Sequence, residues 1–359
     1  MLNAYARIAS VVAFAALTAP SRMAYAQPAL VTWKATEQWR VDGTQGGQAF
    51  GNVRDIAIGQ DGTLWVLDYT DQTFRRFDAS GKPLPSVGRR GQGPGEMSKA
   101  NGMVVLRDGS VWVNDPVNKR MTVFDATGTF SRQYLAFSGG YGFRWDGWID
   151  RKTGDVIDKA MIRRPGATRY AMEFQRFTVN GVIRDTVAIP TCSPGVGTPW
   201  MAYKGESRNS NTVSAYPFTT GGGTAADGMG AVWCAEPASR RAALVRIGKH
   251  DTIAQTSLTL APIPVDQRER DIEIGSARAR VSKYATNDFD ASKIPSMKPP
   301  IASLTVDDDD QLWVQHTDRM HDRTTTFDVH DATGKHRRAV GDIPTRTTYT
   351  IARTPARHS

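Results

Sequence analysis

The sequence contains few of the residues that most often carry covalent or metal chemistry. It has two cysteines, Cys192 and Cys234, and six histidines in 359 residues. Neither cysteine has a second Cys or a His at the spacing of a zinc site. The pair therefore forms either one disulfide or two buried free thiols. No nucleophile-elbow motif accompanies the histidines, so a Ser-His-Asp hydrolase is not supported.

Long apolar runs are also missing. No stretch of the chain reaches the roughly 18 uninterrupted apolar residues of a transmembrane helix. The N-terminus combines Arg7, a short apolar run at 8–19 and a small-x-small cleavage pattern at 24–26. We therefore expect residues 1–26 to be a signal peptide and residues 27–359 to be one soluble periplasmic or secreted domain without a membrane anchor.

The charge of the chain is unbalanced but not clustered. The formal net charge is +9, from 45 Lys and Arg against 36 Asp and Glu. No block of basic residues with interleaved aromatics is present, which argues against nucleic acid as a partner. A scattered positive charge instead favours anionic surroundings such as cell-envelope polymers.

In place of these features the chain has an internal repeat. Asp61-Gly62 recurs as Asp108-Gly109, and the stretch at 77–81 recurs as 124–128. Trp65-Val66 and Trp112-Val113 occupy matching positions in the two copies. Self-similarity of this length is typical of the four-stranded blades of a β-propeller, each of which buries its faces only against its neighbours.

The repeat predicts an all-β propeller of four-stranded blades. Five blades are expected, at 56–88, 103–134, 148–189, 213–260 and 301–343. The remaining strands, at 31–41 and 347–353, make half a blade together. We therefore expect six blades, the last one curtailed and closed by the N- and C-terminal strands; the alternative is a ring of five with an extra ribbon.

Two segments interrupt the period. Residues 191–211 are rich in Pro, Gly, Ser and Asn and predict a long loop. Residues 264–284 predict a short helical insertion, because Asp266 can cap the helix and Glu269 stands where a capping box needs an acid.

The linker at 88–97, Gly-Arg-Arg-Gly-Gln-Gly-Pro-Gly-Glu-Met, resembles a motif of the NHL-like six-bladed β-propellers of bacterial envelopes. The resemblance extends to Val306-Asp307 followed by Leu312-Trp313-Val314, and it covers most of the chain. It implies an exported six-bladed propeller and no particular activity, because many such proteins have no assigned chemistry.

Functional residues are expected on the side of the ring that carries the linkers and the loops between second and third strands. The candidates for ligand binding are Arg89, Arg90, Glu96, Asn101, Asp68, Asp115, Glu236 and His316. Arg89 and Arg90 suit bidentate binding of a carboxylate or phosphate. For Asp68 and Asp115 we favour the alternative that they accept N–H bonds within their own loops. The linker glycines are not expected to cradle a phosphate, because a strand follows them and not a helix.

Metal binding has weaker support. Asp55, Asn101 and Asp146 stand at the entries of innermost strands, where a propeller can hold a divalent ion such as calcium. The run 307–310 reads as a charged turn, and His316 with Asp318, His321 and Asp322 as a solvated loop. We therefore predict a monomeric module without a cofactor that binds a small molecule, a carbohydrate or a protein. The alternative is a metal-dependent lactonase- or esterase-like hydrolase, or a lyase, with its site at the channel mouth.

Overall fold

The computed structural model describes most of the chain from residue 31 onward. The described residues are 31–34, 39–41, 50–135, 145, 147–150, 152–162, 165–166, 171–188, 200–204, 211–219, 223–227, 231–236, 241–247, 252–260, 263–284, 290–307, 309–320 and 322–344. The expected signal peptide lies outside them. Among the described residues no helix is long and apolar enough to cross a membrane.

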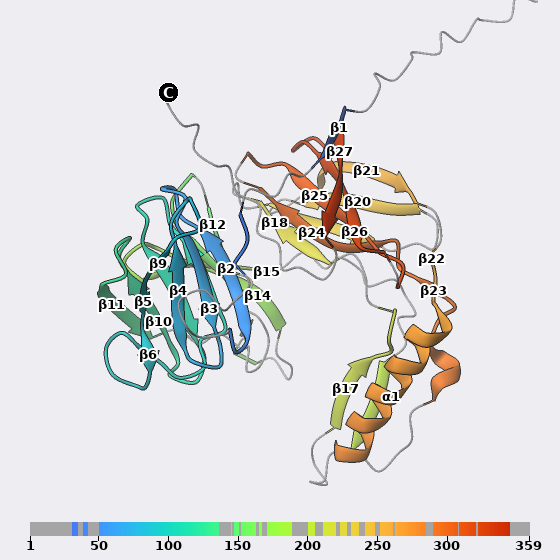
Figure 1. Cartoon of the computed structure of the whole chain (residues 1–359), viewed down its shortest axis with the longest axis horizontal. Helices are drawn as coiled ribbons and strands as arrows, with labels where there is room; N and C mark the ends of the chain where they lie inside the picture. Colours follow the sequence, from blue (N-terminus) through green and yellow to red (C-terminus); the bar gives the residue numbers. More distant parts are fainter. Residues whose placement is uncertain are drawn as a thin grey trace, which may run out of the picture. The chain divides into compact units, whose positions relative to one another are not determined.

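The fold is an all-β propeller of four-stranded antiparallel blades, of which five are seen in the described residues (Figure 1). In each blade the strands follow one another in chain order. Blade 1 contains β2 (Val53–Ile58), β3 (Leu64–Asp68), β4 (Thr73–Phe77) and β5 (Pro83–Val87); blade 2 contains β8 (Gly102–Val105), β9 (Val111–Asp115), β10 (Arg120–Phe124) and β11 (Phe130–Leu135); blade 3 contains β12 (Trp148–Ile149), β13 (Val156–Ile162), β14 (Ala171–Phe177) and β15 (Ile183–Ala188); blade 4 contains β18 (Thr224–Ala226), β19 (Val232–Glu236), β20 (Arg241–Ile247) and β21 (Thr252–Thr259); blade 5 contains β24 (Ile301–Val306), β25 (Leu312–His316), β26 (Thr324–His330) and β27 (His336–Pro344).

The repeated turns form because glycine supplies a backbone conformation that other residues adopt at a cost. Gly62 and Gly109 close the first turn of blades 1 and 2 with φ of 81° and 80°. Gly81 and Gly128 do the same in the turn between third and fourth strands, with φ of 84° and 93°. These values lie in the left-handed region, which explains why the Gly positions recur with the repeat.

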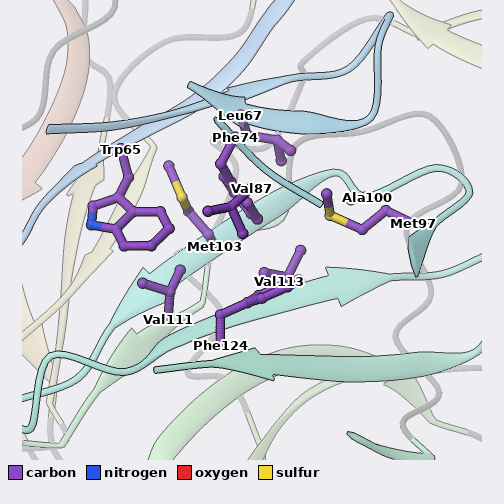
Figure 2. Close-up of a cluster of buried hydrophobic side chains, with 10 residues drawn as sticks. All are labelled: Trp65, Leu67, Phe74, Val87, Met97, Ala100, Met103, Val111, Val113 and Phe124. Carbon is purple, nitrogen blue, oxygen red and sulfur yellow. The ribbon is translucent and has the colours of Figure 1, made fainter. Parts of the chain in front are cut away.

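Apolar side chains from adjacent blades meet in separate clusters. Figure 2 shows the cluster between blades 1 and 2, in which Trp65 and Phe74 of one blade pack with Val111 and Phe124 of the next. The rings of Phe74 and Phe124 meet edge to face at 5.8 Å. Every side chain in such a cluster is removed from water only when both blades are present, so the blades stabilise one another.

A second contact between blades uses arginine. Arg76 of blade 1 donates to the carbonyl oxygens of Thr127 and Ala126, in the turn between the third and fourth strands of blade 2. The same turn of blade 3 accepts from Arg132 of blade 2 at Val179 O, and that of blade 5 accepts from Arg246 of blade 4 at Ala332 O. We call this repeated contact the turn clamp.

Among the described residues, blade 1 is contacted by the N-terminal segment at the position where blades 2, 3 and 5 are contacted by the blade before them. Trp39 Nε1–H donates to Ala79 O at 3.1 Å, in the turn where other blades receive an arginine. Its ring also covers Gly81, as Val87 covers Gly128 in the next blade. The tryptophan therefore fills the position of a preceding outer strand.

The expectation of a curtailed sixth blade is not met in the described residues. The N-terminal strand β1 (Val31–Lys34) pairs in parallel with β27 and becomes a fifth strand of blade 5. It does so because β27 would otherwise leave an unpaired outer edge, which a spare strand can cover. The expected C-terminal strand at 347–353 lies outside the described residues.

The interruption between blades differs in part from the sequence prediction. The expected loop at 191–211 contains strand β16 (Trp200–Lys204), which pairs with β17 (Asn211–Ala215) in a hairpin. The flanking Pro, Gly and Ser residues hid this short strand of large side chains. Blade 4 consequently begins at β18 and not at residue 213.

The predicted helix is confirmed as α1 (Gln267–Tyr284), which lies beside β17 in Figure 1. Asp266 caps it, because its Oδ1 accepts from the N–H groups of Arg268 (2.9 Å) and Glu269 (3.4 Å). Ala277 of the helix packs with Tyr216 after the hairpin. A 3₁₀ turn (Ala291–Lys293) and the paired short strands β22 (Ile263–Pro264) and β23 (Met297–Lys298) return the chain to blade 5.

Candidate functional site

The strand order gives blades 1 and 2 two distinct ends. The turn end carries the turns at 59–63 and 106–110 and the hairpin turns at 78–82 and 125–129. The linker end carries the loops at 69–72 and 116–119 and the linker at 88–101. Most of the candidate residues named above lie at the linker end.

Asp68 and Asp115 are fully buried and hold their own loops. The carboxylate of Asp68 accepts from the backbone N–H groups of Gly51 (2.7 Å) and Thr70 (2.9 Å). That of Asp115 accepts from Ser98 N–H at 2.7 Å, the matching position in the repeat. Each aspartate thus ties the loop between second and third strands to the segment that enters its blade, so neither is presented to a ligand.

The glycine-rich linker is closed by its own acid. Strands β6 (Arg89–Arg90) and β7 (Glu96–Met97) pair in parallel around the loop at 91–95. Glu96 Oε2 accepts from Gly93 N–H at 2.8 Å, and Oε1 accepts from Arg89 Nε at 2.8 Å. The hydrogen bond from Gly93 and then that from Arg89 lower the pKa of Glu96. The carboxylate occupies the place that an anion would take in a phosphate-binding loop.

A side chain that the sequence analysis did not single out fixes this linker. The buried guanidinium of Arg120 donates to Gln92 O at 2.9 Å and to Gly93 O and Glu96 O at 2.8 Å each. Asn118 Nδ2 donates to Gly91 O at 3.1 Å. The sequence signal for this role was a difference between the two repeats: Arg120 stands at the start of the third strand, where the first repeat has Thr73.

Four cations remain at the linker end of blades 1 and 2: Arg89, Arg90, Lys99 and Lys119, all exposed. The Arg89 side chain is 80% exposed although it pairs with Glu96. Arg90 bonds to the carbonyl oxygen of Thr70. Lys99 and Lys119 take part in no ion pair within the described part of the chain. We call these four residues the cationic rim.

The described metal-ligand candidates form structural hydrogen bonds, Asp55 between blades 1 and 2 and Asn101 within blade 2. Asp55 Oδ2 accepts from the N–H of Met103 in blade 2 at 2.9 Å, and Asn101 Oδ1 accepts from Asn114 Nδ2 at 2.8 Å. Asp146 lies outside the described residues. Among the described residues, no group of three His, Cys, Asp or Glu side chains is arranged to hold a metal ion.

The turn at 307–310 is held by its first aspartate. Asp307 Oδ1 accepts from the N–H groups of Asp309 and Gln311, both at 2.9 Å, and its Oδ2 accepts from Trp313 Nε1 at 2.7 Å. Asp308 lies outside the described residues. These bonds agree with the prediction of a charged turn.

His316 belongs to a cluster that the sequence analysis missed. Its Nε2 lies 2.7 Å from Asp328 Oδ2, and His336 Nε2 lies 3.0 Å from Asp328 Oδ1. His330 stands behind them, with its ring 5.0 Å from that of His336. The sequence could have indicated part of this cluster, because residues two apart in a strand share a face and Asp328 and His330 are two apart in β26. Of the expected partners in the loop, His321 lies outside the described residues.

Asp318 lies beside this cluster and is influenced by it. Burial raises the pKa of its carboxyl above the ordinary value, against a hydrogen bond from Thr325. The carbonyl oxygen of Asp318 accepts from Lys298 Nζ at 2.9 Å, and Lys298 also pairs with Glu269 of α1 at 2.6 Å. The Glu269 carboxylate therefore pairs with Lys298, and this ion pair connects the helical insertion to blade 5.

Two candidates remain. Glu236 ends β19 at its linker end, where it pairs with Ala243 of β20. Cys234 is buried and disulfide-bonded. Cys192, the other cysteine of the chain, lies outside the described residues, and its pairing with Cys234 stays a prediction.

No protein-family model and no curated protein matches the sequence. Three solved structures illustrate the similarity of fold. A Bacteroides fragilis protein described as exported shares 13% identity over 87% of this chain and 79% of its own, with a TM-score of 0.43. Virginiamycin B lyase from Staphylococcus aureus shares 14% over 87% and 76%, with a TM-score of 0.40. A gluconolactonase from Xanthomonas campestris shares 13% over 81% and 75%, with a TM-score of 0.38. Likenesses this distant assign no activity to this chain, and membership of the NHL-like family stays unconfirmed.

Proposed function

We propose that the protein is an exported binding module and that it binds an anionic ligand at the cationic rim. The observation that carries this proposal is the unequal use of charge at the linker end. Asp68, Asp115 and Glu96 direct their carboxylates at backbone N–H groups of their own loops. The four cations of the rim are exposed, whereas Asp71 is the one exposed acid in these described loops and lies 3.6 Å from Arg75. An approaching ligand therefore meets mainly positive charge.

The rim is also held in a fixed shape. Arg120 and Glu96 leave the linker loop little freedom between Arg90 and Lys99, and the buried Asp115 anchors the backbone of Lys99 at 3.1 Å. A preformed cationic surface loses less conformational entropy when it binds an extended anion than a mobile one does. A carboxylated or sulfated polymer of the cell envelope fits these requirements.

The test compares two triple variants of the chain from residue 27 onward. The first, Arg90→Gln, Lys99→Gln and Lys119→Gln, removes three charges from the rim. The second, Lys82→Gln, Arg107→Gln and Lys152→Gln, removes three exposed charges from turns of blades 1 to 3. Binding to polygalacturonate and to dextran sulfate is measured at two salt concentrations, with neutral dextran as a blank.

The rim variant is expected to bind at least tenfold more weakly and with a smaller dependence on salt, while the turn variant changes less than twofold. Equal losses in the two variants would show that net charge alone drives retention, and the proposal would then fail. Binding to neutral dextran with the same affinity would overturn it as well.

A further inference from the structure

One buried side chain of blade 5 departs from the repeat. His330 ends the third strand, at the position occupied by Phe77, Phe124 and Phe177 in the first three blades. The match is structural too, because the pairing of third and fourth strands shifts register next to Phe124, Phe177 and His330. His330 is 1% exposed. An ionisable group therefore replaces an apolar ring in the contact region between blades.

The hydrogen bonds of His330 leave one nitrogen without a partner. Its Nδ1 lies 3.1 Å from Gly334 O, and a carbonyl oxygen only accepts, so Nδ1 carries the proton. Its Nε2 is buried and has no hydrogen-bond partner among the described residues. A proton on Nε2 would create a buried cation whose new N–H has no acceptor, which is costly.

The neighbours of His330 hold three strands together. Asp328 of β26 accepts from His316 of β25 on one side and from His336 of β27 on the other. Strand β27 in turn carries β1, through the register from Val31 opposite Arg338 to Lys34 opposite Gly341. Any change that pushes β27 away from β26 therefore also loosens the N-terminal strand.

We propose that His330, Asp328 and His336 form an acid-sensitive latch that holds β27, and with it β1, against the rest of blade 5. In the closed state His330 is neutral and packs as the phenylalanines of the other blades do. Protonation at Nε2 places a positive charge beside the His336 ring. The pair β26–β27 then separates more easily, and β1, which among the described strands pairs only with β27, leaves blade 5 together with it.

The charges around His330 decide the direction of the pH effect. Asp328 and Asp331 of its own strand and turn favour the cation, while His336 of β27 opposes it. Blade 4 contributes Arg246, which reaches Ala332 O but is paired with Asp227 at 2.5 Å. Burial outweighs the acids and lowers the pKa of His330 below its ordinary value.

Because the pKa of His330 is lower in the folded chain than in the unfolded chain, the contribution of neutral His330 to folding stability is complete above the unfolded-state pKa of about 6.5. As the pH falls below that value toward the folded-state pKa, the unfolded chain binds a proton that the folded chain does not, and this stability is lost. At pH 5.0 the folding equilibrium constant can fall by up to about 30-fold if His330 stays neutral in the folded chain. Burial would by itself favour the neutral carboxyl at Asp328, but the hydrogen bond from His316 and the charges of the three neighbouring histidines together outweigh it and lower the pKa of Asp328. The loss that follows protonation of Asp328 therefore belongs to pH values below about 4.

The test uses the whole chain from residue 27 and the variant His330→Phe, which restores the residue of the other blades. Urea unfolding is measured at pH 7.5 and 5.0, together with amide exchange in β1 and β27, corrected for intrinsic rates. We expect the wild-type equilibrium constant to fall 10- to 30-fold more than that of the variant. Exchange in β1 should accelerate at pH 5.0 in the wild type only.

Two further variants keep the outcome decisive. His330→Gln removes the titration while retaining a donor for Gly334, so the pH effect should vanish even if phenylalanine does not fit. His316→Gln is the matched control, because His316 contacts Asp328 from β25, and it should retain the effect. Parallel pH dependence in wild type and both His330 variants, or loss of the effect in His316→Gln, would overturn the latch.

Discussion

Replacing Arg120 by alanine tests whether the linker loop is built by this single guanidinium. Arg120 is 7% exposed and makes three hydrogen bonds of 2.8 to 2.9 Å to carbonyl oxygens of the loop. A hydrogen bond from a charged donor contributes about 1.5 to 3 kcal/mol, but these three share one group, so their contributions do not add in full. We therefore expect Arg120→Ala to lower the free energy of unfolding by about 2 to 4 kcal/mol.

The loss should also open the loop locally. In urea unfolding followed by Trp fluorescence the midpoint should shift while the slope stays unchanged, and trypsin should cleave after Arg90 faster than in the wild type. Arg107→Ala is the matched control, because Arg107 is an exposed arginine of the turn end and its removal should change stability by less than about 0.5 kcal/mol. Lysine at position 120 should recover only part of the loss, since one ammonium cannot reproduce the planar fork. A loss below about 1 kcal/mol with unchanged cleavage would refute this account of the loop.

Two further predictions concern the ends and the cross-link of the fold. Trp39→Ala should lower the free energy of unfolding by about 1 to 3 kcal/mol, because it uncovers Gly81 and removes the donor to Ala79 O. Trp39→Phe should keep most of the packing, and thermal unfolding of the two variants distinguishes these outcomes. Equal Tm values for wild type and Trp39→Ala would contradict the role of Trp39. Denatured, unreduced protein should show no free thiols, and reduction should lower stability by about 4 kcal/mol for a loop of roughly 40 residues between Cys192 and Cys234; two titratable thiols would contradict that pairing.

The sequence predicted those parts of the fold in which local chemistry and global structure agree. The glycines of the turns were visible because only their backbone conformation closes a tight hairpin. The start of α1 was visible because Asp266 can accept from the first N–H groups of a helix. The preference for a structural role of Asp68 and Asp115 followed from the same reasoning about turns, and the contacts agree with it.

The remaining features depended on partners that are distant in the chain. Nothing in the sequence around Arg120 shows that three carbonyl oxygens of an earlier loop surround it. The destination of residues 31–34 depended on which strand had a free edge, and this decided against the curtailed sixth blade in the described residues. The cluster of His316, Asp328, His330 and His336 was not predicted, because these histidines match no metal-ligand spacing and only their positions in the blade bring them together.

The turn clamp has a consequence for how such a chain can grow. Arg76, Arg132 and Arg246 all end on main-chain oxygens, and every amino-acid sequence supplies these. A copied blade therefore finds an acceptor on whatever blade follows it, even after its turn residues have diverged. Adjacent blades need not match in sequence to remain joined, and duplication followed by independent divergence of each copy leaves these contacts intact.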